Sequence, residues 1–122
     1  EATAFGSKAI VERIVEEGIE VDRVVAQGGI PAKNNYVMQV MANVLNMPIE
    51  VATSPEPVAL GAAMFAATAA KVYPSVVVAQ SNMMPKHHFT FTPESKQVDY
   101  YKFLYKQYCS VGTLLEDVLK SL

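Results

Sequence analysis

Residues 27–35 read QGGIPAKNN and join a short apolar run to a helical segment. Because glycine has no Cβ and tolerates positive φ, Gly28 and Gly29 allow both a sharp turn and the close approach of a ligand. The free N–H groups and the positive dipole end of the helix that follows would favour nearby phosphate oxygens. A glycine turn at a strand end is also common without any ligand. The stretch therefore leaves a nucleotide site and a plain turn as equal alternatives.

The segments on either side of the glycine pair predict a strand before it and a helix with a second strand after it. Residues 24–26 form a short apolar run, which favours a strand buried on both faces. Residues 34–46 carry apolar side chains on one helical stripe. The stripe consists of Val37, Val40, Met41, Val44 and Leu45. Pro48 ends this helix, and residues 49–52 predict the second strand.

Two further helices flank this unit in the sequence. Residues 3–17 predict a helix that is apolar on several sides and stops at Gly18. A third helix should run from Pro55 to about Lys71, with Ser54 as its N-cap. Its interior is rich in glycine and alanine, which indicates close helix packing. Its apolar stretch is shorter than the ~20 residues that a membrane span needs.

The last third of the chain predicts two more helices. Residues 76–78 favour a strand by propensity, but Ser75 can cap a short helix, and we predict the helix. Residues 89–93 are predicted as extended or loop, and residues 94–121 as a last helix that bends or breaks at Gly112. Tyrosines near helical spacing on this last helix favour a packing face over a binding platform.

The order strand, helix, strand, helix with short links indicates an α/β fold with a few short parallel strands and several helices. We place the core of this fold in residues 1–84, and a loop with a closing helical segment in residues 85–122. Two strands make a poor parallel sheet, because such sheets bury both faces under several strands. We therefore expect either a fragment of a longer chain or a homo-oligomer in which a second copy completes the sheet.

Composition and charge exclude several classes of function. The chain has 122 residues, of which 51% are hydrophobic, as expected for one packed domain. Its net charge of -2 and its scattered Lys and Arg residues give no electrostatic footprint for nucleic acid. The single cysteine, Cys109, can form no internal disulfide, which suits a cytoplasmic setting. No signal peptide is visible, and we expect no membrane partner.

Candidate catalytic and metal-binding side chains are few. His87 and His88 are adjacent and project in different directions, which favours loop histidines over ligands of one metal. The acidic pairs at residues 16–17 and 116–117 are interpreted as solvated helix surfaces rather than acid–base pairs. The sequence contains neither a GxxxxGK[ST] phosphate loop nor a GxGxxG dinucleotide motif.

The glycine pair and the helix after it remain as the candidate site. The context raises the probability of a ligand, because an apolar strand, the two glycines and a helix follow one another directly. Asn34 stands at the start of that helix, and its amide can both donate and accept hydrogen bonds. The residues alone therefore predict that Asn34 could contact a ribose or a purine edge.

Three segments in the same order resemble the C-terminal lobe of the FGGY carbohydrate kinases. They are EATAFG at residues 1–6, GGIPAKN at 28–34 followed by MQ at 38–39, and ALGAA at 59–63. The resemblance covers about residues 1–84, and residues 100–108 are similar to the closing helix of the family. Three motifs in order are far more specific than any one of them. Within the family, the resemblance is closest to kinases that phosphorylate ribulose to its 5-phosphate.

The resemblance implies an actin-like (ribonuclease H-like) ATPase fold of two lobes, in which ATP lies in the cleft and the second lobe holds the adenosine. Gly28 and Gly29 would lie against the nucleotide, and Asn34 would contact it. Mg²⁺ would screen the phosphates, and the missing lobe would hold the ketopentose. The family's catalytic Asp and first phosphate loop would precede these residues. We therefore assign no catalytic residue or metal ligand here and expect the chain alone to be inactive.

The sequence departs from the family pattern at three places. Asn43 stands where such kinases often have Asp, and Lys71 where Gly is frequent. Glu56-Pro57 is an unusual opening for the third helix. The departure at Asn43 puts in doubt whether this chain has the surface or cleft carboxylate that an Asp would supply at that position. Gly61, within ALGAA, would allow close packing beneath the nucleotide site.

Two alternative functions follow from these observations. Another FGGY kinase, acting on xylulose, glycerol or a different sugar or polyol, would share the same nucleotide-side residues. A non-enzymatic α/β interaction module would use the glycine pair only as a turn. An upstream lobe with a phosphate loop would favour a kinase over the interaction module.

Overall fold

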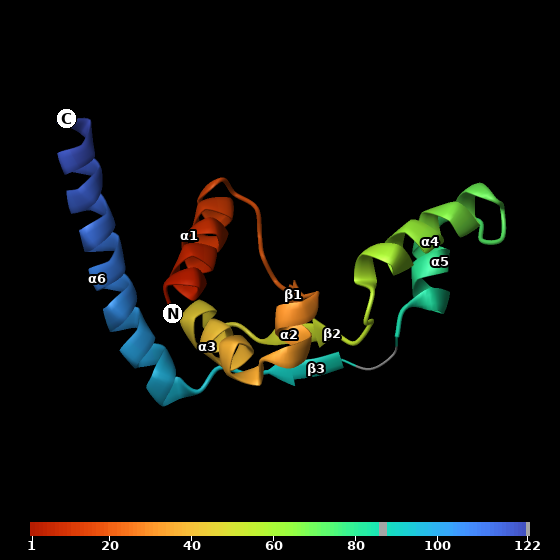
Figure 1. Cartoon of the computed structure of the whole chain (residues 1–122), viewed down its shortest axis with the longest axis horizontal. Helices are drawn as coiled ribbons and strands as arrows, with labels where there is room; N and C mark the ends of the chain where they lie inside the picture. Colours follow the sequence, from red (N-terminus) through yellow and green to blue (C-terminus); the bar gives the residue numbers. More distant parts are fainter. Residues whose placement is uncertain (86–87, 122) are drawn as a thin grey trace. The chain divides into compact units, whose positions relative to one another are not determined.

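The computed structural model describes residues 1–85 and 88–121, which form six helices and a three-stranded sheet (Figure 1). The elements in chain order are α1 (Ala2–Glu16), β1 (Val24–Ala26), α2 (Gly29–Lys33), α3 (Asn35–Leu45), β2 (Ile49–Ala52), α4 (Pro57–Ala69), α5 (Val76–Met83), β3 (His88–Phe91) and α6 (Ser95–Lys120). No helix in this described part is long and apolar enough to cross a membrane.

The described residues divide into two compact units. Unit 1 contains the described residues within Glu1–Val24, Tyr36–Ile49 and Phe91–Leu122. Unit 2 contains those of Val25–Asn35 and Glu50–Thr90. The boundary at residues 84 and 85 that the sequence suggested stays a prediction.

The predicted α/β class is confirmed, and the elements around the glycine pair lie close to their predicted positions. β1 and β2 have the predicted bounds, and α3 begins one residue later than expected. The strand order is β1-β2-β3, so the two predicted strands are neighbours in the sheet. They are joined through α2 and α3, which is the kind of crossover that parallel strands require.

The third strand, β3, lies in the segment that the sequence predicted as extended or loop. It pairs with β2, and Figure 1 shows the two arrows running in opposite directions. The predicted burial of β1 on both faces is wrong, since Val25 is 37% exposed. Among the described strands, β1 pairs with β2 alone, whereas β2 has a neighbour on each side and buries Ile49 and Val51.

The start of α4 differs from the prediction. The N-cap is Glu56 rather than Ser54, and Pro57 rather than Pro55 begins the helix. The physical reason is the second proline, because the residue before a proline is pushed out of helical backbone angles. Glu56 accordingly has φ -130° and ψ 69°. At the other end of α4, Lys71 has a φ of 58°, in the left-handed region that favours glycine.

The predicted helix after Ser75 is confirmed as α5. The Ser75 Oγ accepts a hydrogen bond from the Val78 N–H at 3.3 Å, which is the expected N-cap. The predicted break at Gly112 is wrong, because α6 is one helix of 26 residues that passes through it. A glycine inside a helix costs only about 1 kcal/mol relative to alanine, which a long helix can tolerate.

Aromatic side chains form the core of unit 1. Phe5 of α1 lies against three tyrosine rings of α6, with ring centroids 6.3, 5.8 and 5.4 Å away for Tyr101, Tyr105 and Tyr108. Val40 of α3 packs in the same cluster. The prediction that the tyrosines form a packing face is therefore confirmed.

The tyrosine hydroxyls of this cluster bond to carboxylates of the N-terminal segment. The Tyr105 hydroxyl donates to Glu12 Oε2 at 2.6 Å, and the Tyr101 hydroxyl donates to Glu1 Oε1 at 3.2 Å. Burial, reinforced by the hydrogen bond to Glu12, raises the pKa of Tyr105. Burial, together with the nearby charge of Glu1, also raises the pKa of Tyr101. Both hydroxyls are therefore held in the neutral, hydrogen-bonded form.

Asn43 is a buried polar residue at the centre of unit 1, only 4% exposed. Its Oδ1 accepts hydrogen bonds from Gln39 Nε2 at 3.1 Å and from the Glu94 N–H at 2.8 Å. Glu94 is the N-cap of α6, so Asn43 ties α3 to the start of α6. This position is thus buried and structural, held by the two hydrogen bonds that Asn43 accepts.

In unit 2, α4 packs on α5, but few of its residues are covered. Among the described residues, Met64 is the buried residue of α4 and Ala79 is the buried residue of α5. A Cβ built on Gly61 would meet no other atom within 4 Å. No described residue packs closely on Gly61, so its role beneath the nucleotide site stays a prediction, and the small side chains of α4 mostly face outward.

Candidate nucleotide site

The glycine pair forms the predicted sharp turn at the end of β1. Gly28 has φ 101° and ψ -168°, a backbone conformation that a residue with a Cβ rarely adopts, and it caps α2. A Cβ built on either Gly28 or Gly29 would meet no other atom within 4 Å. Both glycines are exposed. The turn therefore presents open backbone on which a ligand could lie closely.

A short helix that the sequence did not predict, α2, follows the turn. α2 has only five residues and ends at Asn34, whose φ of -134° and ψ of 87° separate it from α3. α3 therefore does not start directly behind the glycine pair. Asn34 instead lies exposed in the joint between the two helices.

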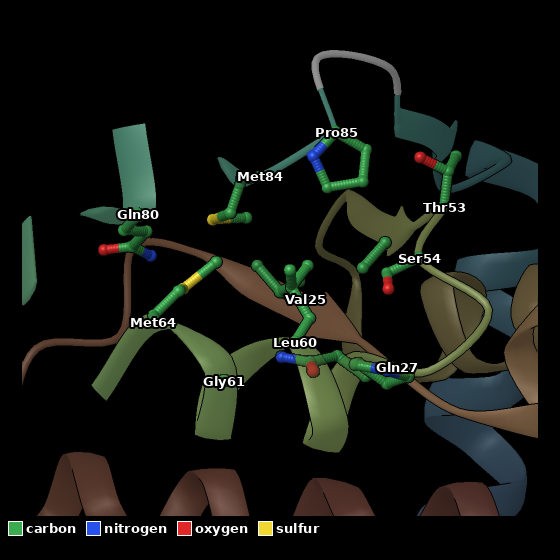
Figure 2. A pocket seen from close by; sticks show the side chains of 12 residues that line it. Val25, Gln27, Thr53, Ser54, Leu60, Gly61, Met64, Gln80, Met84 and Pro85 are labelled. Carbon is green, nitrogen blue, oxygen red and sulfur yellow. The ribbon is translucent and has the colours of Figure 1, made fainter. Parts of the chain in front are cut away.

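A pocket of about 200 Å³ lies in the same unit as the glycine pair. It is lined by Val25, Gln27, Ala52, Thr53, Ser54, Pro57, Leu60, Gly61, Met64, Gln80, Met84 and Pro85. These residues come from the ends of β1 and β2, from α4 and from the end of α5. Figure 2 shows Met64 and Met84 directed towards the same space from opposite sides.

The lining combines apolar surfaces with a few polar groups. Leu60 and the two methionines supply apolar, adaptable contacts, while the amide of Gln80 and the hydroxyl of Ser54 can form hydrogen bonds. Such a lining suits a flat, largely apolar group with a polar edge. Gln27 connects the pocket to the turn, because it lines the pocket and directly precedes Gly28.

The sequence prediction and the structure overlap only in part at this site. Gly28, Gly29 and Asn34 belong to the same unit as the pocket but are not among its lining residues. The pocket residues Ser54, Met64 and Gln80 were missed. A signal was present for Ser54, because ligands of α/β folds bind beyond the carboxyl ends of strands and Ser54 closely follows β2. Nothing in the local pattern marks Met64 or Gln80.

The shape and chemistry of the turn and the pocket limit what they could bind. The open glycine turn and the pocket beside it can receive a flat base with its ribose. In the part of the chain described, no group of three His, Cys, Asp or Glu residues could hold a metal ion. His87 lies outside the described residues, and the His88 backbone is in β3.

Solved structures with a similar fold are sugar kinases. A ligand-bound xylulose kinase from Lactobacillus acidophilus matches 93% of this chain and 22% of its own, with a TM-score of 0.79 and 20% identity. A gluconate kinase from Lactobacillus acidophilus matches 92% of this chain and 22% of its own, with a TM-score of 0.78 and 20% identity. The predicted class, part of the C-terminal lobe of an actin-like ATPase fold, is confirmed by these neighbours.

The family follows from the sequence comparison. The model of the FGGY family of carbohydrate kinases, C-terminal domain, matches residues 1–70. The chain belongs to this family, as the three motifs predicted. Ribulokinases from Geobacillus thermodenitrificans and Anoxybacillus flavithermus are each 42% identical to it over 130 aligned residues, which include 100% of this chain. The chain spans 23% of the length of these curated relatives.

Proposed function

We propose that this chain is the nucleotide-side part of an ATP-dependent kinase that phosphorylates ribulose to its 5-phosphate. The observation that carries the proposal is the 42% identity to ribulokinases over the whole chain. The open turn at Gly28 and Gly29 supports the nucleotide-binding part of it. The acceptor sugar would be bound by the rest of the kinase, which this chain does not include.

Within this proposal, the described residues of unit 2 bind and orient the nucleotide. The backbone at Gly28 and Gly29 lies against it, and the Asn34 amide forms hydrogen bonds to its ribose or base. ATP would supply the γ-phosphoryl group, with Mg²⁺ neutralising charge on the phosphates. Gln27, which directly precedes Gly28 and lines the pocket, would contact the bound group with its carboxamide. No catalytic base is proposed among these residues, so this chain alone should be inactive.

Substitution of Gly29 tests the nucleotide site. Gly29 has no positive φ, so Gly29→Val should fold, while its branched side chain occupies the surface on which the nucleotide lies. We expect at least about a tenfold loss of ATP affinity in the full-length protein, measured by calorimetric titration. Gly6→Val is the matched control, because Gly6 lies in α1 and its Cβ would also meet open space. Unchanged ATP affinity in Gly29→Val would refute the assigned role.

A kinase for another sugar or polyol is the second candidate. It is favoured by the fold neighbours, which are xylulose and gluconate kinases. Initial rates of ADP formation with ribulose, xylulose, glycerol and gluconate, measured on the full-length protein, distinguish these substrates. Formation of ADP with none of them, and no ATP binding, would favour the non-enzymatic interaction module.

A further inference from the structure

Gln39, a half-buried residue of α3, forms two hydrogen bonds within unit 1. Its Nε2 donates to Asn43 Oδ1 at 3.1 Å and to the Thr92 carbonyl oxygen at 2.8 Å. Thr92 directly follows β3, which ends at Phe91. Both donors of the Gln39 amide are therefore engaged, and they hold the side chain against the connection between β3 and α6.

Asn43 extends this network one turn further along α3. Because Gln39 and Asn43 are four residues apart, they lie on the same side of the helix. The Asn43 Oδ1 also accepts a hydrogen bond from the Glu94 N–H at 2.8 Å, and this buried oxygen is thereby satisfied. The side of α3 that carries the two amides is thus fixed to residues 92 and 94.

The start of α3 is joined directly to Asn34 of the nucleotide site. Asn34 precedes Asn35, the first residue of α3, and Gln39 follows four residues later, about 6 Å along the helix. Val40 and Val44 hold the later turns of α3 in the aromatic core of unit 1. The hydrogen bonds of Gln39 hold an earlier turn, from which the chain leads back to Asn34.

We propose that Gln39 is a positioning residue for the nucleotide: its carboxamide fixes the start of α3 and, through it, the amide of Asn34. This inference rests on the proposed function, in which Asn34 binds the ribose or the base. A side chain binds a ligand well when its neighbours are themselves held in one conformation. Without the Gln39 hydrogen bonds, Asn34 would occupy several orientations, and the nucleotide would bind more weakly.

A double-mutant cycle on the full-length protein, with ATP affinity measured by calorimetric titration, tests the positioning role. Gln39→Met keeps the length of the side chain but removes both donors. It should weaken ATP binding by about threefold to tenfold, the range expected for one lost hydrogen bond. Because Gln39 acts through Asn34, the double variant should bind ATP as Asn34→Ala alone does. Effects that multiply in the double variant would overturn the proposal.

Two further substitutions of Gln39 separate its donors from its size. Gln39→Glu has the shape of glutamine without a donor, so its loss of ATP affinity should be at least that of Gln39→Met. Gln39→Lys retains donors on a flexible side chain and should bind ATP within about twofold of wild type. An equal loss of affinity in Gln39→Lys and Gln39→Met would overturn the proposal.

Tyr105→Phe is the matched control for a general loss of stability. It removes the hydrogen bond to Glu12 in the same unit and leaves the amides of α3 intact. Thermal unfolding should show a lower midpoint for Tyr105→Phe, while its ATP affinity stays that of wild type. If Tyr105→Phe weakened ATP binding as much as Gln39→Met does, the effect would be one of stability, and the positioning role would be overturned.

The same titrations distinguish this inference from the proposed function. If Gly29→Val and Asn34→Ala weaken ATP binding while Gln39→Met binds like wild type, the nucleotide site stands and the positioning role alone is overturned. Unchanged ATP affinity in both Gly29→Val and Asn34→Ala would overturn the nucleotide site and the positioning role together.

Discussion

Unit 1 and unit 2 differ in how far their own residues cover their aromatic side chains. In unit 1, Phe5 is buried among the tyrosines of α6, and their hydroxyls bond to carboxylates. In unit 2, Phe65 of α4 is 65% exposed and a pocket lies between the strand ends and the helices. Unit 1 is therefore stabilised by contacts among its own side chains. Unit 2 instead has exposed apolar surface and a pocket, which a ligand or another part of a longer protein could cover.

Truncation of the two phenylalanines is the strongest test of this difference. Phe5→Ala should lower the free energy of unfolding by about 3–5 kcal/mol, because it opens a cavity among the tyrosine rings. Phe65→Ala should lower it by less than about 0.5 kcal/mol, since the ring is mainly in solvent. Urea unfolding of the described chain measures both. If Phe65→Ala lowered the free energy of unfolding as much as Phe5→Ala does, Phe65 would have to be covered by other residues, and the contrast between the two units would be contradicted.

The buried amide of Asn43 provides the next largest effect. Asn43→Leu should cost about 2 kcal/mol, since it leaves the Glu94 N–H without its acceptor and removes one of the two acceptors of the Gln39 amide, whose other acceptor is the Thr92 carbonyl. Asn43→Asp keeps an acceptor oxygen in the same place and should cost less. Urea unfolding at neutral pH compares the two variants. Equal stability of Asn43→Leu and wild type would show that this hydrogen-bond network does not hold α3 to α6.

The tyrosine cluster should make unit 1 sensitive to alkali. The pKa of Tyr101 and that of Tyr105 are both raised in the fold, so their stabilisation is complete below the ordinary tyrosine pKa near 10. It is lost as pH rises further, because the unfolded chain ionises first. Urea unfolding between about pH 8 and pH 11 measures this slope. Tyr105→Phe should reduce it, and a flat profile would contradict the assignment.

The smallest expected effect lies at the end of α4 in unit 2. Lys71→Gly should raise the free energy of unfolding by about 0.5–1 kcal/mol, because glycine adopts the observed φ of 58° without a Cβ clash. Ala70→Gly is the matched control and should lower stability, since Ala70 has an ordinary φ of -74°. Thermal unfolding compares the two. Stabilisation by both variants would indicate that the end of α4 is not held in this turn.

The elements that the sequence predicted well are those fixed by local pattern. The stripe of Val40 and Val44 located α3, and Ser75 located the start of α5. The predictions were wrong where two possible helix starts lay close together in the sequence, or where a single glycine was given too much weight. Pro57 displaced Ser54 and Pro55 at the start of α4, and the long α6 helix absorbed Gly112 without a break.

The candidate site was predicted less completely than the fold. Gly28 could be recognised because a positive φ after a strand requires a residue without a Cβ. Met64 and Gln80 could not, because they are distant in sequence from the glycine pair and nothing about their neighbours marks them as pocket residues. Their role depends on how α4 and α5 pack behind the strand ends.

The family, the strands β1 and β2, the amphipathic α3 and the glycine turn could be predicted from the sequence alone, because each depends on neighbouring residues or on motifs in a fixed order. The burial of Asn43, the place of β1 at the edge of the described sheet and the pocket beside Gln27 became visible only in the tertiary structure. The physical reason is that burial and cavities are set by which elements pack together, and contacts between residues far apart in sequence leave no local periodicity.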